Sequence, residues 1–107
     1  MTNNKRWYDQ DPTVSLAVSI LRNASMQNQL LTAEYIIQKG LEYDFPIEKV
    51  KSQKIDLLPR RWYDFEENVY YALECMRLSS IDVQKTLAIE IINYLCKLDN
   101  SIDKDLV

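Results

Sequence analysis

The strongest constraint on the fold is an internal repeat. When the 107-residue chain is shifted by 55 positions, residues 6–37 align with residues 61–92 without a gap, and twelve positions are identical. Four of these spell RWYD, at residues 6–9 and 61–64, and they contain both tryptophans of the chain. Composition alone predicts about two identities, so the repeat indicates one structural unit that is built twice. The other identical pairs are Val14/Val69, Ala17/Ala72, Arg22/Arg77, Ser25/Ser80, Gln29/Gln84, Ala33/Ala88, Ile36/Ile91 and Ile37/Ile92.

The first copy has the pattern of two consecutive helices. Asp11 is a good N-cap residue, and Pro12 suits the first helical position because its missing N–H costs nothing there. Apolar residues then recur at helical spacing over residues 12–23. Ser25 can cap a second helix, which we expect to end near Gly40, where glycine accommodates a left-handed closing residue.

The second copy repeats this pattern. Glu66 and Glu67 lie in the first turn of a third helix, where negative charge complements the helix dipole. Ser79 with Asp82 three residues later resembles a capping box, so we expect a fourth helix to start there. The expected apolar stripes of the four helices are Val14, Ala17, Val18 and Leu21; Leu30, Ala33, Ile36, Ile37 and Leu41; Val69, Ala72, Leu73 and Met76; and Val83, Leu87, Ala88, Ile91, Ile92 and Leu95.

The fold class follows from these stripes. A hairpin of two amphipathic helices exposes an apolar side, and two such hairpins shield both sides by packing face to face. One glycine and three prolines also leave few positions for the tight turns of β folds. We therefore expect an all-α fold, a four-helix arrangement made of two tandem helical hairpins with approximate internal two-fold symmetry.

The repeat also divides the chain, which we expect to form a single domain over residues 1–107. The first hairpin covers about residues 6–44 and the second about residues 61–99. The connecting segment, about 45–60, is long for a bundle loop, and Pro46 and Glu48 favour a short helix within it. The polar tail at 100–107 lacks apolar periodicity, so we expect it to fray or to be disordered.

The repeated tetrapeptide has a structural and a functional interpretation. Its aromatic residues precede helix starts, where large rings can pack over the first turn, and an exposed patch of such rings could instead bind a partner. The candidate partner-binding residues are Trp7, Tyr8, Trp62, Tyr63 and Tyr70. Arg22 lies about 20 Å along the helix from Asp9 and cannot easily reach it. We therefore expect crossed ion pairs between the halves, Arg22 with Asp64 and Arg77 with Asp9.

A basic segment gives the alternative function. Residues 48–61 have a net charge of +3, whereas the whole chain has −3. Cations next to Trp62 and Tyr63 could contact phosphates and stack on unpaired bases, as in proteins that bind single-stranded nucleic acid. The basic residues of this candidate patch are Lys49, Lys51, Lys54, Arg60 and Arg61.

Several kinds of chemistry have no support in the sequence. The chain lacks histidine, the commonest general base and metal ligand, and one glycine cannot form a glycine-rich phosphate loop. The two cysteines, Cys75 and Cys96, align with Ile20 and Leu41, so we expect both to be small buried apolar residues. We expect no catalytic residues, no metal and no cofactor.

The expected function is therefore that of a small non-enzymatic helical interaction or scaffold protein. Its partner would be another protein or a second copy of the chain, docked through an apolar groove between the hairpins. No run of eighteen apolar residues and no N-terminal hydrophobic segment is present, so we expect no membrane partner. Two distant cysteines suit a reducing compartment, and we expect the protein in the cytoplasm.

Overall fold

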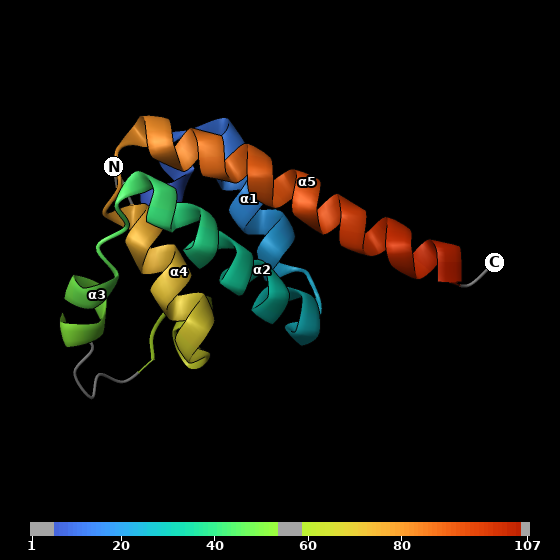
Figure 1. Ribbon diagram of the computed structural model, residues 1–107, viewed down its shortest axis with the longest axis horizontal. Helices are drawn as coiled ribbons and strands as arrows, with labels where there is room; N and C mark the ends of the chain where they lie inside the picture. The colour runs from blue at the N-terminus through green and yellow to red at the C-terminus, as the bar shows by residue number, and fades with distance from the viewer. Residues whose placement is uncertain (1–5, 54–58, 106–107) are drawn as a thin grey trace, which may run out of the picture.

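The fold is all-α, as predicted. The computed structural model describes residues 6–53 and 59–105, with side chains described as far as Asp99, and this part of the chain contains helices and no strands (Figure 1). The α-helices are α1 (Pro12–Arg22), α2 (Met26–Gly40), α3 (Ile47–Gln53), α4 (Glu67–Arg77) and α5 (Ile81–Asp105). Three short 3-10 helices accompany them: η1 (Trp7–Gln10), η2 (Leu41–Tyr43) and η3 (Trp62–Phe65).

The helix starts follow local capping signals. The Asp11 carboxylate accepts hydrogen bonds from the backbone N–H groups of Thr13 (2.9 Å) and Val14 (3.1 Å), which confirms it as the N-cap of α1. The hydroxyl of Ser25 likewise caps α2. The expected cap at Ser79 is wrong, because α5 starts at Ile81 and the hydroxyl of Ser80 accepts the N–H of Val83. The Ser79 hydroxyl instead donates to the carbonyl of Cys75.

Two repeated glutamines close the first helix of each half. The side-chain amide of Gln29 donates to the carbonyls of Leu21 and Arg22, both at 3.1 Å, at the end of α1. Gln84 donates to the carbonyl of Met76 (2.9 Å) at the end of α4. The last carbonyls of a helix have no partner within the helix, so each glutamine fixes the turn between two helices.

The helices of the two halves are interleaved. α1 packs most extensively along α5, and α2 along α4, so each first helix lies mainly against the second helix of the other half (Figure 1). The expected stripes of α1 and α4 are fully buried, and those of α2 and α5 are buried or half-buried except for Leu41. Leu41 is 62% exposed because α2 ends at Gly40, before Leu41.

The segments outside the two hairpins are more helical than expected. The short helix predicted in the connecting segment exists as α3, with Val50 buried. The expectation of a non-helical tail is wrong for residues 100–105, because α5 continues to Asp105; residues 106–107 lie outside the described residues. No glycine or proline follows Pro59, so nothing in the sequence stops the helix. None of the described helices is both long and apolar enough to cross a membrane.

Gly40 has a different role from the one predicted. Its backbone is right-handed, with φ −62°, and the left-handed residue is Asp44, with φ 58°. A Cβ atom at residue 40 would overlap the ring of Phe45, which is itself buried. Glycine is therefore required because the chain folds back and lays this ring against the end of α2.

Gly40→Ala should destabilise the fold by about 1–3 kcal/mol, the usual cost of overpacking a filled site. Helix propensity alone predicts the opposite sign, because alanine stabilises a helix by about 1 kcal/mol relative to glycine. The sign of the measured change therefore distinguishes the two effects. Urea denaturation measures the change. In a Phe45→Ala background the same substitution should cost nothing, because the ring is gone. An equal cost in both backgrounds would contradict this role of Gly40.

Candidate functional site

Both RWYD segments fold into the same local structure. We call residues 6–9 the first corner and residues 61–64 the second corner. Each spans the start of a short 3-10 helix in which the arginine pairs with the aspartate three residues later. The distances are 2.8 Å from Arg6 Nε to Asp9 Oδ2 and 3.0 Å from Arg61 Nη2 to Asp64 Oδ1. Residues adjacent in sequence are thus sufficient to shape each corner.

The rings of each corner are held by contacts within the tetrapeptide. Trp7 and Tyr8 pack edge to face with centroids 5.3 Å apart, and Trp62 and Tyr63 do so at 5.6 Å. The arginine stacks over the tyrosine ring, with its guanidinium carbon 4.7 Å from the ring centre in the first corner and 4.6 Å in the second. This shared geometry explains why the whole tetrapeptide occurs twice.

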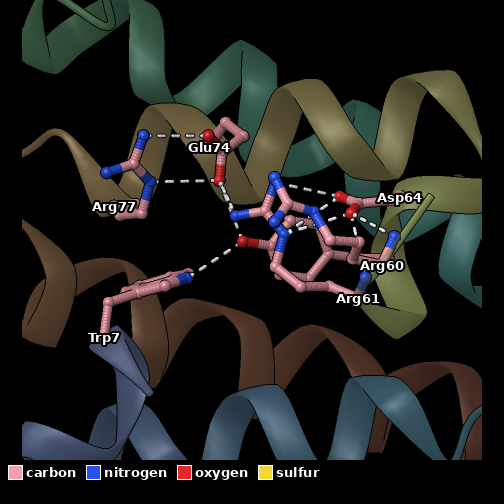
Figure 2. Close-up of polar contacts among 7 residues, drawn as sticks. Trp7, Arg60, Arg61, Asp64, Glu74 and Arg77 are labelled. Atoms are coloured by element: carbon pink, nitrogen blue, oxygen red, sulfur yellow. Dashed lines mark hydrogen bonds and ion pairs between the residues drawn. The ribbon is translucent and has the colours of Figure 1, made fainter. Parts of the chain in front are cut away.

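A buried carboxylate completes the second corner (Figure 2). The side chain of Glu74, on α4, is only 8% exposed. Its Oε2 accepts hydrogen bonds from Arg61 Nη1 at 2.8 Å and from the Tyr63 hydroxyl at 2.9 Å. Arg77 approaches from the other side, with Nη2 2.9 Å from Oε1 and Nε 3.1 Å from Oε2. Two cations and a hydroxyl therefore compensate the buried charge, as such a charge requires.

These contacts set the protonation states in the second corner. Burial alone raises the pKa of Glu74, but the hydrogen bonds from Arg77 and Tyr63 and the charges of the two arginines outweigh it, so the pKa lies below its ordinary value of 4.5. Burial raises the pKa of Tyr63, which remains a neutral phenol. The carboxylate is therefore ionised and saturated with donors, which suits a structural anchor and leaves no base or nucleophile available.

Trp7 connects this network to the other half. Its indole Nε1 donates to the Tyr63 hydroxyl at 3.0 Å across 56 residues of sequence (Figure 2). The Tyr63 hydroxyl thus accepts from one half and donates to Glu74 in its own half. The equivalent nitrogen of Trp62 is buried and has no hydrogen-bond partner among the described residues. The two corners therefore differ in their contacts beyond the tetrapeptide.

The expected crossed ion pairs, Arg22 with Asp64 and Arg77 with Asp9, do not form among the described residues. Asp9 binds Arg6 and accepts from the Ser15 hydroxyl. Asp64 binds Arg61 and accepts the backbone N–H groups of Arg60 and Arg61, at 3.1 and 2.9 Å. Arg77 binds Glu74, three residues earlier. Partners within one helical turn are already in reach, whereas a crossed pair would require long side chains to span two helices.

The candidate partner-binding rings are largely inside the protein. Tyr8 is 5% exposed and Tyr63 is 1% exposed, so neither can meet a partner. Trp7, Trp62 and Tyr70 are half-buried against the core. The expectation of an exposed aromatic patch on the tetrapeptides is therefore wrong, because the rings pack on their own helices and across the two halves.

The candidate basic patch is divided. Lys49 and Lys51 are exposed on α3, and Lys51 Nζ lies 5.7 Å from the ring centre of Tyr71. Arg60 is exposed, whereas Arg61 is bound by Asp64 and Glu74; Lys54 lies outside the described residues. Because Tyr63 is buried, the expected stacking of bases on this ring is not available.

The cysteines differ from one another. Cys75 is fully buried, and this burial, followed by the nearby charge of Glu74, raises the pKa of its thiol to about 11. It behaves as the small core residue that the repeat predicts. Cys96 is exposed, so the same expectation is wrong there. Its aligned residue, Leu41, is exposed as well.

Sequence reasoning missed Glu74. The available signal was the repeat itself, because Glu74 aligns with the uncharged Ser19 and directly follows Leu73 of a buried stripe. No group of three or more cysteine or acidic side chains in the described ranges could hold a metal ion. Comparisons of the chain with protein-family models, with curated proteins and with solved structures found no match.

Glu74→Gln should destabilise the protein by about 3 kcal/mol near neutral pH, because it leaves two partly buried arginines without their counter-charge. The stabilisation from a carboxylate with a lowered pKa is present above its ordinary value of 4.5 and is lost as the pH falls through the lower folded value. The difference from the native chain should therefore shrink below that pH in urea titrations. Glu34→Gln, on the exposed face of α2, is the control. A difference independent of pH would contradict the role of the charge.

Thiol labelling of the native protein should modify Cys96 and leave Cys75 intact, since only the former is exposed and the latter is protonated in the core. A chromogenic disulfide reagent should therefore report one thiol per chain before denaturation and two afterwards. Rapid labelling of Cys75 in the native state would overturn its assignment as a core residue. Cys96→Ser, which should abolish the native signal, is the control.

Proposed function

We propose that this chain is a small non-enzymatic helical interaction protein that associates with a second copy of itself. The observation that carries the proposal is a pair of exposed apolar side chains on the packed helices α1 and α5. Leu16 on α1 and Ile89 on α5 are each 53% exposed. Scattered exposed apolar residues are normal, but these two lie at the same level of adjacent helices, and that arrangement favours an interface.

The ion pair between Asp11 and Lys85, at 3.5 Å, fixes that level. Leu16 and Ile89 follow these two residues by about one helical turn. Farther along, residues at the end of α1 and residues late in α5 line one groove. The two helices therefore meet both near their starts and farther along, so they run in the same direction. A self-complementary contact between two copies would cover both side chains on each copy at once.

The other half supplies an internal model for such a cover. Tyr71, which aligns with Leu16, lies on α4, and α3 packs against that helix (Figure 1). Val50 of α3 is buried in this contact region. In the part of the first half that the structure describes, no equivalent of α3 lies over α1, which supports an external helix in that place.

A non-enzymatic role has separate support. The carboxylates of Asp64 and Glu74 are saturated by arginine and backbone donors, so neither is a poised acid or base. The buried thiol of Cys75 is held protonated, because burial raises its pKa to about 11. Two unpaired cysteines also fit a reducing compartment, and we propose a cytoplasmic location on that ground.

We further propose that the chain is a tandem duplication of one helical hairpin, with the halves related by an approximate two-fold axis. The contact between Tyr35 and Glu90 supports this, because these two positions align with each other and their side chains form a hydrogen bond of 2.6 Å. An axis there would also interchange two other contacts. These are the stacked pair Tyr35 and Tyr94, at 4.4 Å, and the ion pair of Lys39 with Glu90, at 3.5 Å.

The proposed self-association predicts a dimer in multi-angle light scattering at micromolar concentration. Leu16→Asp combined with Ile89→Glu should weaken it by roughly tenfold or more per site, since burying one such side chain contributes about 1.5–3 kcal/mol. Gln38→Glu adds one negative charge to an exposed position of α2 and should leave the dimer intact. A monomeric native chain, or a double variant that still dimerises, would sink the proposal.

A further inference from the structure

The helices that follow the two corners differ at one informative position. The corner residues themselves and the arginine that ends the helix, Arg22 or Arg77, are the same in both copies. Glu74 of α4, however, aligns with Ser19 of α1. The second corner therefore receives a carboxylate from its own chain, and the first corner does not.

The sequence spacing around Ser19 otherwise matches that around Glu74, although Ser19 is exposed and Glu74 is buried. Each corner belongs to a 3-10 helix of four residues that precedes an α-helix of eleven residues. Arg6 lies thirteen residues before Ser19, as Arg61 does before Glu74, and it stacks on its tyrosine in the same way. Arg22 follows Ser19 by three residues, the spacing at which Arg77 binds Glu74. Two arginines thus lie at the sequence positions from which their counterparts, Arg61 and Arg77, bind Glu74.

The side chains of Arg22 and Trp62, whose counterparts belong to the Glu74 network, have no hydrogen-bond or ion-pair partner among the described residues. Arg22 forms no ion pair and no side-chain hydrogen bond with the residues that the structure describes, whereas its counterpart Arg77 binds Glu74 twice. The indole Nε1 of Trp62 is buried without an acceptor, whereas its counterpart Trp7 donates to Tyr63. A buried donor without a partner is costly, and under the proposed equivalence of the halves this donor corresponds to the Trp7 indole that binds Tyr63 beside Glu74.

We propose that the first corner is a binding site for a carboxylate group, which would occupy the place over Ser19 that the Glu74 carboxylate occupies in the other half. Arg22 and Arg6 bind its charge. Ser19 and Arg22 are exposed, and the Arg6 side chain is 54% exposed, so the site is open to solvent. This inference rests on the proposed equivalence of the two halves.

A groove beside the site offers room for the rest of the ligand. Ser19 lines a hollow of about 480 Å³ between the end of α1, the start of α2 and the later part of α5. Asn28 lines it too; this residue is 9% exposed, and its side-chain amide forms no hydrogen bond with the described residues. Ile20 and Leu95 add apolar surface, and Asp99 disfavours a second negative charge. The groove therefore suits a ligand with one carboxylate, an apolar stem and an amide, as in a glutamyl residue of a peptide.

Ser19→Glu tests the vacant position without any ligand. The new carboxylate should reach Arg22 and Arg6 and raise Tm by about 4–8 °C, the shift expected when a satisfied partly buried site is gained in a domain of this size. Ser19→Gln has the same shape without the charge and should give no such gain. The gain should be lost in an Arg6→Ala background. An increase that does not depend on Arg6 would reflect an ordinary pair with Arg22 on one helix, and it would overturn the proposed site.

A titration tests binding directly. N-acetylglutamic acid α-amide, which carries one carboxylate, should shift the Trp62 indole and Arg22 Nε signals in nitrogen–proton correlation spectra, with a Kd on the order of millimolar. The neutral N-acetylglutamine amide should not, and Ser19→Glu should abolish the shifts because its own carboxylate fills the site. Butyrate represents a simple carboxylic acid. Weaker binding of butyrate than of the glutamyl probe indicates that the ligand is a peptide, and equal binding indicates that it is a free acid. Equal shifts from the charged and neutral amides would overturn the proposal.

The two proposals fail separately. Loss of the dimer in the Leu16→Asp, Ile89→Glu variant bears only on self-association, whereas the Arg6-dependent gain of Ser19→Glu bears only on the first corner. A native monomer that binds the glutamyl probe would leave the carboxylate site standing. A dimer that ignores the probe would remove the site and leave the proposed self-association intact.

Discussion

The buried carboxylate of Glu74 is the interaction on which the rest of the structure depends. An ionised carboxylate that is 8% exposed is tolerated only because Arg61, Arg77 and Tyr63 are all in place around it. Arg61 and Tyr63 come from the second corner, and Arg77 comes from the end of α4. The carboxylate thereby fixes the position of the second corner on α4. The hydroxyl of Tyr63 connects this network to the other half, because it accepts a hydrogen bond from the indole of Trp7.

The differences between the aligned halves are as informative as the identities. The shared residues build the frame: the corners, the caps and the glutamines that close α1 and α4. The differences place a carboxylate at one corner where the other half has a serine, and a half-buried tyrosine on α4 where α1 has an exposed leucine. Under the proposed duplication, the second half supplies its own carboxylate and packs its own helix against the tyrosine. In the first half, the corresponding positions remain open to a ligand or a partner.

Sequence reasoning succeeded where a feature depends on neighbours along the chain. Asp11 and Ser25 cap helices because the N–H groups they bind lie two or three residues away, and the buried stripe of α1 follows from helical periodicity alone. The all-α fold and the short helix α3 were predictable for the same reason.

The features that sequence reasoning missed depend on contacts across the fold. Gly40 is fixed by the ring of Phe45, which meets it only after the chain turns back. The role of Glu74 depends on a tyrosine eleven residues away and an arginine thirteen residues away. The burial of Tyr8 and Tyr63 likewise depends on how the two halves pack. Periodicity reports which face of a helix is buried, and it does not report which polar group meets another across the core.

The central claim is that the bond from Trp7 to Tyr63 couples the two halves through the Glu74 network. The most direct measurement is a double-mutant cycle with Trp7→Phe and Tyr63→Phe, analysed by urea denaturation. A native hydrogen bond in this partly buried position predicts a coupling energy of about 0.5–1.5 kcal/mol. Strictly additive effects of the two substitutions would contradict the account.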